Sequence, residues 1–361
     1  MKKVKNILFK LKMNGEGIVN YDSADQKNQF YGTNLKGKMD ATNVNKNVSY
    51  AKKNFYGDDD NLSYKIKISS NCLRHGIFEG DVKIQSPNII HHEFVLHSFI
   101  ASPASILRGY ILNSRNEGYK RSGALNIDDA EQTCDAKSNI ETFSRSGLKE
   151  TDAETTDNSF FKKETIGKIK YESKGFIDLM QLQFVSCDKV FDRFSFNPDL
   201  FPVYKKFLQT KLPSFNSELG YYQIKDSIIE IPEYGFKLDN ENLNIIIRGL
   251  FERLLKLNIL RSGAYASTSE LQYKLVYDSL EDTMNDENNW VTIKSLEDIN
   301  SFNVEVEDFY LPEDIDMAKS KREAIEAEYI RVRETNKAND KKDREAKKKA
   351  AEEAKSKKAT A

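Results

Sequence analysis

Two long polar stretches divide this 361-residue chain, at residues 23–62 and 113–173. The first is rich in Asn, Lys and Asp and has few aliphatic side chains, and the second is rich in Ser, Thr, Lys and Glu. Segments of this composition cannot bury enough apolar surface to form a core of their own. The core must therefore be assembled from the apolar segments on either side, and the two polar stretches are predicted to be insertions.

The apolar segments between these stretches carry the two-residue alternation of β-strands. In residues 5–14, Ile7, Phe9 and Leu11 fall on one face and Lys10 and Lys12 on the other, which predicts a half-buried strand. Further strands are predicted at residues 63–69, 175–186, 221–231 and 271–277. The segment at residues 175–186 is the most apolar of these and is predicted to be one central strand.

Helical patterns separate the predicted strands. Residues 91–101 have a helical apolar pattern, and Ser102 followed by Pro103 is typical of an N-cap and first helical residue, so a short helix should deliver Arg108 to its end. Residues 241–260 form an amphipathic pattern. Strands alternating with helices indicate the α+β class, and an RRM-like (ferredoxin-like) core is the natural candidate.

The chain changes character near residue 315. Residues 1–315 are predicted to form a single domain, and residues 316–361 a Lys/Glu/Ala-rich tail with 15 basic and 10 acidic side chains. The tail favours helix by propensity but lacks the apolar repeat of a coiled coil. A solvated segment is one interpretation; the other is a basic arm that touches nucleic acid or a neighbouring subunit.

Several classes of protein are disfavoured by composition. The sequence contains no apolar run of about 18 residues, so we expect no membrane association. Three widely spaced cysteines and the lysine-interrupted N-terminus favour a reducing, cytoplasmic location. No CxxC pair, P-loop or HExxH motif is present, so we expect no metal and no cofactor.

The adjacent Arg74 and His75 are the most enzyme-like pair in the chain. A histidine beside an arginine could act as a general acid or base on RNA, but it would need a second proton-transfer group. The other histidines, at 91, 92 and 97, lie in no comparable polar motif. Three interpretations stay open for His75: a structural residue under a turn, an RNA contact, or a catalytic group.

Basic residues fall repeatedly at turns beside the predicted strands. Such positions can line one groove, in which Lys and Arg contact phosphates and fix register without reading sequence. Phe161 beside Lys162 would add a stacking surface, or would instead anchor the insertion to the core. The predicted RNA-binding residues are Asn20, Lys36, Lys38, Lys52, Lys53, Arg74, His75, Arg108, Lys120, Arg121, Ser122, Phe161, Lys162 and Arg261.

Four short motifs carry a resemblance to a known family. They read NCLRHGIF (71–78), ILRGYIL (106–112), KRSGALNI (120–127) and QLQFVSCDKVFDR (181–193). Together and in this order they resemble the repeated backbone subunit of type I CRISPR surveillance (Cascade) complexes of the RAMP superfamily, closest to the type I-F variant. The matching segments span about residues 5–280, and the tail has no counterpart.

The resemblance implies an RRM-like palm with a thumb, here residues 24–62, and a finger region, here residues 113–173. It implies no enzymatic activity. Many copies would stack head to tail along one guide RNA (crRNA), beside other Cascade subunits, and the guide would pair with target DNA. Two alternatives stay open: a ribonuclease of the same superfamily that processes crRNA through His75, and a self-assembling protein that binds no nucleic acid.

Overall fold

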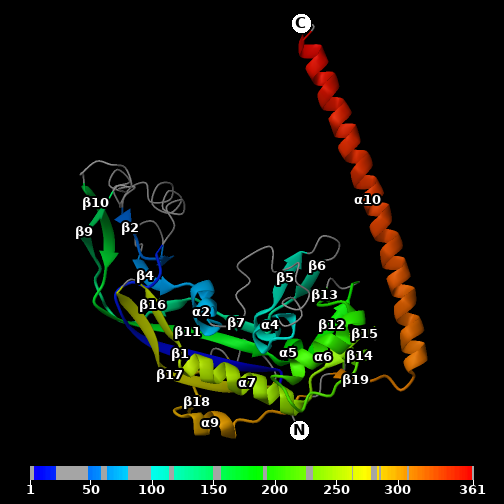
Figure 1. Ribbon diagram of the computed structural model, residues 1–361, viewed down its shortest axis with the longest axis horizontal. Helices are drawn as coiled ribbons and strands as arrows, with labels where there is room; N and C mark the ends of the chain where they lie inside the picture. The colour runs from blue at the N-terminus through cyan, green and yellow to red at the C-terminus, as the bar shows by residue number, and fades with distance from the viewer. Residues whose placement is uncertain are drawn as a thin grey trace.

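The computed structural model describes residues 4–21, 48–57, 63–79, 99–113, 118–148, 156–189, 193–224, 231–261, 263–277, 283, 286–306 and 309–359. One large, antiparallel sheet crosses the middle of the molecule (Figure 1). Its spatial order is β16 (Asn258–Arg261), β17 (Ala264–Val276), β1 (Asn6–Glu16), β11 (Lys168–Asp178), β8 (Ala130–Gln132), β4 (Ser63–Ile68) and β3 (Lys53–Tyr56). The shorter β7 (Leu125–Ile127) pairs with β11, and β18 (Val291–Ile293) pairs with β17.

The alternation of residues 5–14 is confirmed by β1, the central strand of this sheet. Phe9 and Leu11 are fully buried against the helices, and Phe9 faces Gly175 of β11, where a Cβ would lie 2.3 Å from the Phe9 ring. Lys10, on the opposite face, is also buried, because its ammonium contacts Glu287 at 2.5 Å and lies 4.7 Å from the centre of the Trp290 ring. Both faces of β1 are therefore covered.

Helices α2 (Ser70–Ile77) and α7 (Asn240–Leu255) pack on the large sheet, and α4 (Pro103–Arg108) lines a pocket together with α7. Phe251 of α7 lies 5.6 Å from Tyr273 of β17, centre to centre. Arg253 of α7 donates a hydrogen bond to the Ile77 carbonyl at 3.1 Å, which joins α7 to the end of α2. The predicted helix at 241–260 is thus confirmed up to Leu255, but its last residues form β16 instead.

A second sheet packs beside the first, at the end of the molecule where α10 begins (Figure 1). It comprises β13 (Arg193–Phe194), β12 (Phe184–Asp188), β15 (Glu233–Lys237), β14 (Gly220–Ile224) and β19 (Phe309–Tyr310). η3 (Pro198–Leu200) and α6 (Phe201–Gln209) lie between β13 and β14 in the chain, and Phe196, Tyr204 and Phe236 form the aromatic core here. Two further helices are α9 (Leu296–Ser301) and α10 (Ile315–Ala359).

The prediction of one strand at 175–186 is wrong. This segment holds the end of β11, the short helix α5 (Leu179–Gln183) and the start of β12, so it passes from one sheet to the other. Asp178 causes the break, because its carboxylate caps α5 by accepting the Gln181 amide at 2.9 Å. The predicted helix at 91–101 lies largely outside the described residues: of residues 99–101, which are described, Phe99 and Ile100 are helical and Ala101 is in a turn.

The two insertions meet in one lobe. β9 (Asn139–Leu148) and β10 (Thr156–Thr165) form an antiparallel hairpin from the second insertion, and β2 (Val48–Ser49) of the first pairs in parallel with β10. Within the range 113–173 of the predicted finger region, β7, β8 and the first half of β11 lie in the large sheet, whereas β9 and β10 lie in the lobe. The remaining hairpin, β5 (Tyr110–Asn113) with β6 (Gly118–Arg121), packs beside β13.

Glu164 joins the two insertions at the base of the lobe. Its carboxylate lies 2.8 Å from the Lys53 ammonium, and both side chains are at most 6% exposed. It also accepts hydrogen bonds from the Ala51 amide at 2.9 Å and the Ser138 hydroxyl at 2.5 Å. Burial and the charge of Glu164 raise the pKa of Tyr21 above its ordinary value. This buried ion pair is thus the electrostatic centre of the junction.

Glu164→Gln should lower the free energy of unfolding by about 3–5 kcal/mol, because it leaves the Lys53 cation buried and uncompensated. Urea unfolding measures this. Replacing Lys53 with Met in the Glu164→Gln background should recover part of the loss, since the unpaired charge is then removed.

The matched control is Glu141→Gln, which removes an exposed carboxylate from the neighbouring strand β9. Its effect should stay within about 0.5 kcal/mol. Equal effects of the two substitutions would contradict the assignment of Glu164 as the junction.

Candidate nucleic-acid interface

The first turn of α2 brings separate parts of the chain together. Ser69 is the N-cap, and its hydroxyl accepts hydrogen bonds from the Cys72 amide at 3.4 Å and from Asn20 Nδ2 at 2.8 Å. The Asn20 carbonyl accepts the Lys52 amide at 3.1 Å. Asn20 thus connects the loop after β1 to α2 and to the residue that immediately precedes β3.

Two cations lie beside this turn. Burial raises the pKa of the Cys72 thiol, and the positive charges of Arg261 and Lys52 act against that increase. Arg261 is exposed at the end of β16, where Gly263 adopts a positive φ of 85° in the turn to β17. The loop after β1, the segment before β3 and the strand β16 thus lie close to α2.

Arg74 and His75 lie on the same helix. His75 is exposed, whereas Arg74 is half-buried and its Nε atom has no hydrogen-bond partner within the described part of the chain. We call the group formed by Asn20, Lys52, Arg74, His75 and Arg261 the α2 site. It combines long cationic side chains with an amide, groups that can contact phosphate.

Asp129 fixes the position of α2. Its carboxylate accepts the Ser70 amide at 2.7 Å and pairs with Lys67 at 2.7 Å. Burial acts to raise the pKa of Asp129, but the hydrogen bonds from Lys67 and Ser70 outweigh it and leave the pKa below its ordinary value. Its charged form therefore stabilises the fold.

Asp129→Asn should lower the free energy of unfolding by about 1 kcal/mol near neutral pH, through loss of the Lys67 pair. Because the folded-state pKa is lowered, the stabilisation is present above the unfolded-state pKa of about 4 and disappears as the pH falls through the folded-state value. Unfolding from pH 7 to pH 2 should show the two proteins converging below about pH 4. Asp135→Asn, at an exposed site, is the control, and a gap that persists at pH 2 would contradict this role.

A second group of predicted residues lies where α4 meets β6. Arg108 and Ser122 are exposed, and Lys120 is half-buried on β6. Their segments touch: Gly109 adopts a φ of 73°, and a Cβ there would lie 2.4 Å from the Gly123 amide. Arg108 and Ser122 thus stay available to a ligand at a site separate from α2.

Arg121 does not belong to a binding surface, which corrects the prediction. It is 4% exposed, and its guanidinium donates to the carbonyls of Gln181 at 2.8 Å, Phe184 at 3.0 Å and Ile106 at 3.3 Å. Burial lowers the pKa of this guanidinium. Its role is to hold β6 against α5 and α4.

Lys53 is a second correction, because its ammonium is committed to Glu164. Lys36 and Lys38 lie outside the described residues. Phe161 and Lys162 lie on β10, where Lys162 is opposite Val48 of β2, but their side chains are not among those described. Of the lysines predicted in the first insertion, the structure thus brings Lys52 alone, among those described, to the α2 site.

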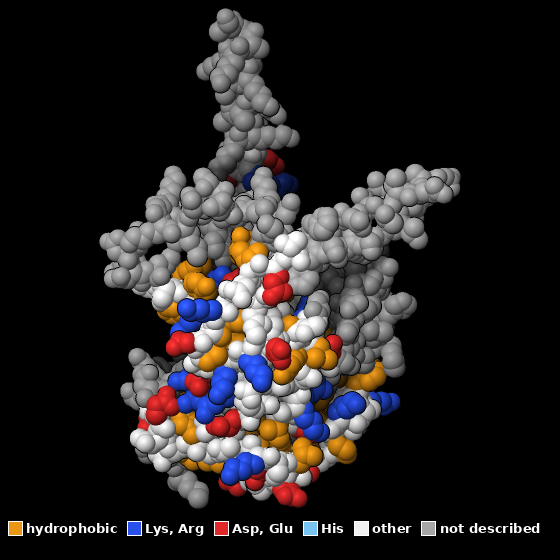
Figure 2. All heavy atoms as spheres, turned by 90° about the vertical axis from the view of Figure 1, so that its left-hand side faces the viewer, with side chains coloured by type: hydrophobic (Ala, Val, Ile, Leu, Met, Phe, Trp, Pro, Cys, Tyr) orange, Lys and Arg blue, Asp and Glu red, His pale blue; other side chains and the backbone are white. Residues whose placement is uncertain are grey.

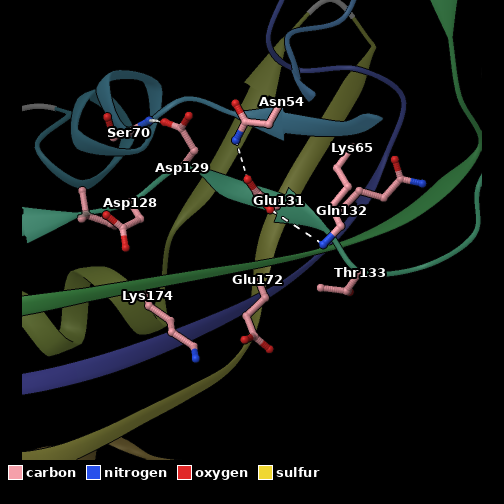
Figure 3. Close-up of a pocket in the computed structure, with 11 residues that line it drawn as sticks. Asn54, Lys65, Ser70, Asp128, Asp129, Glu131, Gln132, Thr133, Glu172 and Lys174 are labelled. Carbon is pink, nitrogen blue, oxygen red and sulfur yellow. Dashed lines mark hydrogen bonds and ion pairs between the residues drawn. The ribbon is translucent and has the colours of Figure 1, made fainter. Parts of the chain in front are cut away.

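A pocket of about 610 Å³ next to α2 has the wrong charge for a polyanion (Figure 3). Its lining carries the carboxylates of Asp128, Asp129, Glu131 and Glu172 against two ammonium groups, of Lys65 and Lys174. Burial and its acidic neighbours raise the pKa of Asp128. Sequence reasoning missed these carboxylates; the run Asp128, Asp129 and Glu131 was the available signal. Within the described residues, no cluster of His, Cys, Asp or Glu side chains could hold a metal ion.

The end of the molecule that carries the lobe shows Lys and Arg side chains in small groups among acidic and hydrophobic ones (Figure 2). The described part of this face is therefore not uniformly basic. None of the described helices is long and apolar enough to cross a membrane.

Residues 3–310 match the family model described as type I-Fv CRISPR-associated protein Cas7fv-like. The chain belongs to this family. The match confirms the resemblance to type I-F variant backbone subunits and makes this chain a CRISPR-associated protein. It includes every residue of the α2 site and ends before α10. No curated protein matches the chain.

Among solved structures, the chain is similar to one from a CRISPR RNA-guided surveillance complex, with 10% identity, a TM-score of 0.33, and coverage of 74% of this chain and 68% of that one. A pre-nicking surveillance complex gives 8% identity, a TM-score of 0.35, and coverage of 74% and 77%. A type III-B Cmr-beta complex bound to cognate target RNA gives 11% identity, a TM-score of 0.27, and coverage of 48% of this chain and 47% of that one. These likenesses are too distant to carry an argument about individual residues, so the family assignment rests on the family match.

Proposed function

We propose that this protein is a non-catalytic backbone subunit that oligomerises head to tail along crRNA in a Cascade complex and presents the guide for pairing with target DNA. The observation that carries the proposal is the Cas7fv-like match over residues 3–310. The α2 site, within that range, supplies the cations and amide that a guide backbone would need.

An RRM-like palm is part of the proposal. If β1, β7 with β8, β11 and β17 are its four strands in chain order, their spatial order is fourth, first, third, second. Helices α2 and α4 follow the first strand and α7 follows the third. This arrangement supports a ferredoxin-like βαββαβ core, with the lobe of β2, β9 and β10 as its main insertion.

Backbone recognition suits a guide whose sequence varies. Lys52, Arg74 and Arg261 would contact phosphates, Asn20 would add a neutral hydrogen bond, and the bases would remain free to pair. Copies that follow one strand must contact each other through two different surfaces, because closed symmetry cannot follow a strand. The lobe, at the opposite end of the molecule from α10, supports such a two-surface arrangement (Figure 1).

Light scattering with a 260/280 nm absorbance ratio tests this proposal on protein co-expressed with repeat–spacer transcripts of increasing length. We expect an RNA-bearing oligomer whose mass grows with spacer length. A monomer without RNA would contradict the proposal, and an oligomer without excess absorbance at 260 nm would favour the protein-only assembly.

Arg261→Glu should weaken RNA binding and reduce the salt dependence by about one unit of slope for each phosphate that is no longer neutralised. Lys294→Glu, with the same charge change at an exposed position beyond β18, is the control. Titration of labelled RNA across salt concentrations measures both slopes, and equal slopes would mean that the α2 site does not contact RNA.

The competing ribonuclease requires His75 and a second proton-transfer group. Under our proposal, a repeat RNA should keep its length after incubation with the unaltered protein and with the His75→Ala variant alike. Cleavage by the unaltered protein that the substitution abolishes would establish the ribonuclease instead.

A further inference from the structure

The long helix α10 lies beyond the part of the chain that matches the family, which ends at residue 310. It begins beside the second sheet and then leaves the body of the molecule (Figure 1). Its function is therefore not explained by the family match, and its own contacts and charges must indicate it.

The base of α10 is firmly attached. Arg322, in its second turn, donates from Nε to Asp188 Oδ2 at 2.8 Å, and its Nη2 donates to the other oxygen of the same carboxylate. The two side chains are 5% and 0% exposed, and Ala318, one turn earlier, is also buried. A two-point ion pair of this kind fixes orientation as well as position, so the helix leaves β12 in a defined direction.

Beyond this anchor the helix contacts little of its own chain. Ile325, Glu326 and Tyr329 are half-buried, and every side chain described from residue 330 to residue 345 is exposed. Residues 323–359 span about 55 Å at 1.5 Å per residue. Most helices in proteins are stabilised by packing against other elements. Because this helix projects from its own domain, its surface is available to pack against another molecule.

Charge divides the projecting part into two halves. Residues 323–336 hold two basic and four acidic side chains, whereas residues 337–358 hold ten basic and five acidic ones. Lys337, Lys341 and Arg344 are exposed and follow the spacing i, i+4, i+7, which puts them on one helix face. Lys348 and Lys355 continue the same spacing along the sequence. The far half thus presents a basic stripe.

We infer that α10 is an arm whose far half binds the phosphate backbone of duplex DNA. A stripe of cations on a rigid rod complements a regular array of phosphates, and the major groove of B-DNA, about 12 Å wide, admits an α-helix. Proteins that bind single strands stack bases on aromatic side chains, and the chain has no aromatic residue after Tyr329. Duplex DNA therefore fits this helix better than the guide RNA does.

The test is a triple substitution, Lys337→Glu, Lys341→Glu and Arg344→Glu, in the full-length protein. Binding to a labelled 30-base-pair DNA duplex and to a 30-nucleotide single-stranded RNA is measured by fluorescence anisotropy across salt concentrations. We expect duplex binding to weaken at least tenfold and its salt slope to fall by about three units, with the RNA affinity changed less than twofold.

The matched control reverses three exposed lysines away from α10, Lys206, Lys211 and Lys294, and so changes the net charge equally. Circular dichroism checks that the helix persists. An equal loss in the control, an unchanged duplex affinity, or a loss confined to the RNA would each overturn the inference. Assembly on guide RNA is measured in a separate experiment. A negative result for duplex binding by α10 would therefore leave the proposed function unaffected, and a negative result for RNA assembly would leave the inference about α10 unaffected.

Discussion

The buried pair between Glu164 and Lys53 is the interaction on which the arrangement of the two insertions depends. Neither insertion has an apolar core, so what fixes them must be polar and specific. Glu164 satisfies Lys53, the Ala51 amide and the Ser138 hydroxyl at once. A buried carboxylate tolerates no other geometry without losing a partner. Glu164 of β10 therefore adds a specific anchor to the backbone pairing of β2 with β10.

That pairing also decides which lysine is available to a ligand. Lys52 and Lys53 are neighbours in an extended segment, so their side chains leave on opposite sides. Lys53 turns inward to Glu164, while the charge of Lys52 acts on Cys72 at the start of α2. In the sequence the two lysines look equivalent. Only the partner 111 residues away distinguishes the structural lysine from the candidate ligand.

The predictable parts of the fold were those governed by local periodicity. Alternation gave β1, β4 and the C-terminal part of β17, helical spacing gave most of α7, and Ser102 with Pro103 gave the start of α4. The break at Asp178 was missed because an apolar run looks alike in a strand and in a short buried helix. The site was less predictable: Arg108 and Arg121 are both arginines at turns, yet Arg121 is enclosed by three distant carbonyls and Arg108 is exposed.

The charged side chains are also unevenly distributed along the chain. The N-terminal 79 residues carry 14 basic and 8 acidic side chains, and the segment between them and residue 316 has an acidic excess of 12. That excess includes the carboxylates that line the pocket beside α2 and repel phosphate. Local potential and not net charge guides the binding of a polyanion, so this pocket is unfavourable for one, in contrast to the predicted contacts at the α2 site and near Arg108. A basic arm on α10 would follow the same principle, since its cations at residues 337–358 lie about 20–50 Å along the helix from residue 323, at least two Debye lengths of about 8–10 Å from the acidic body.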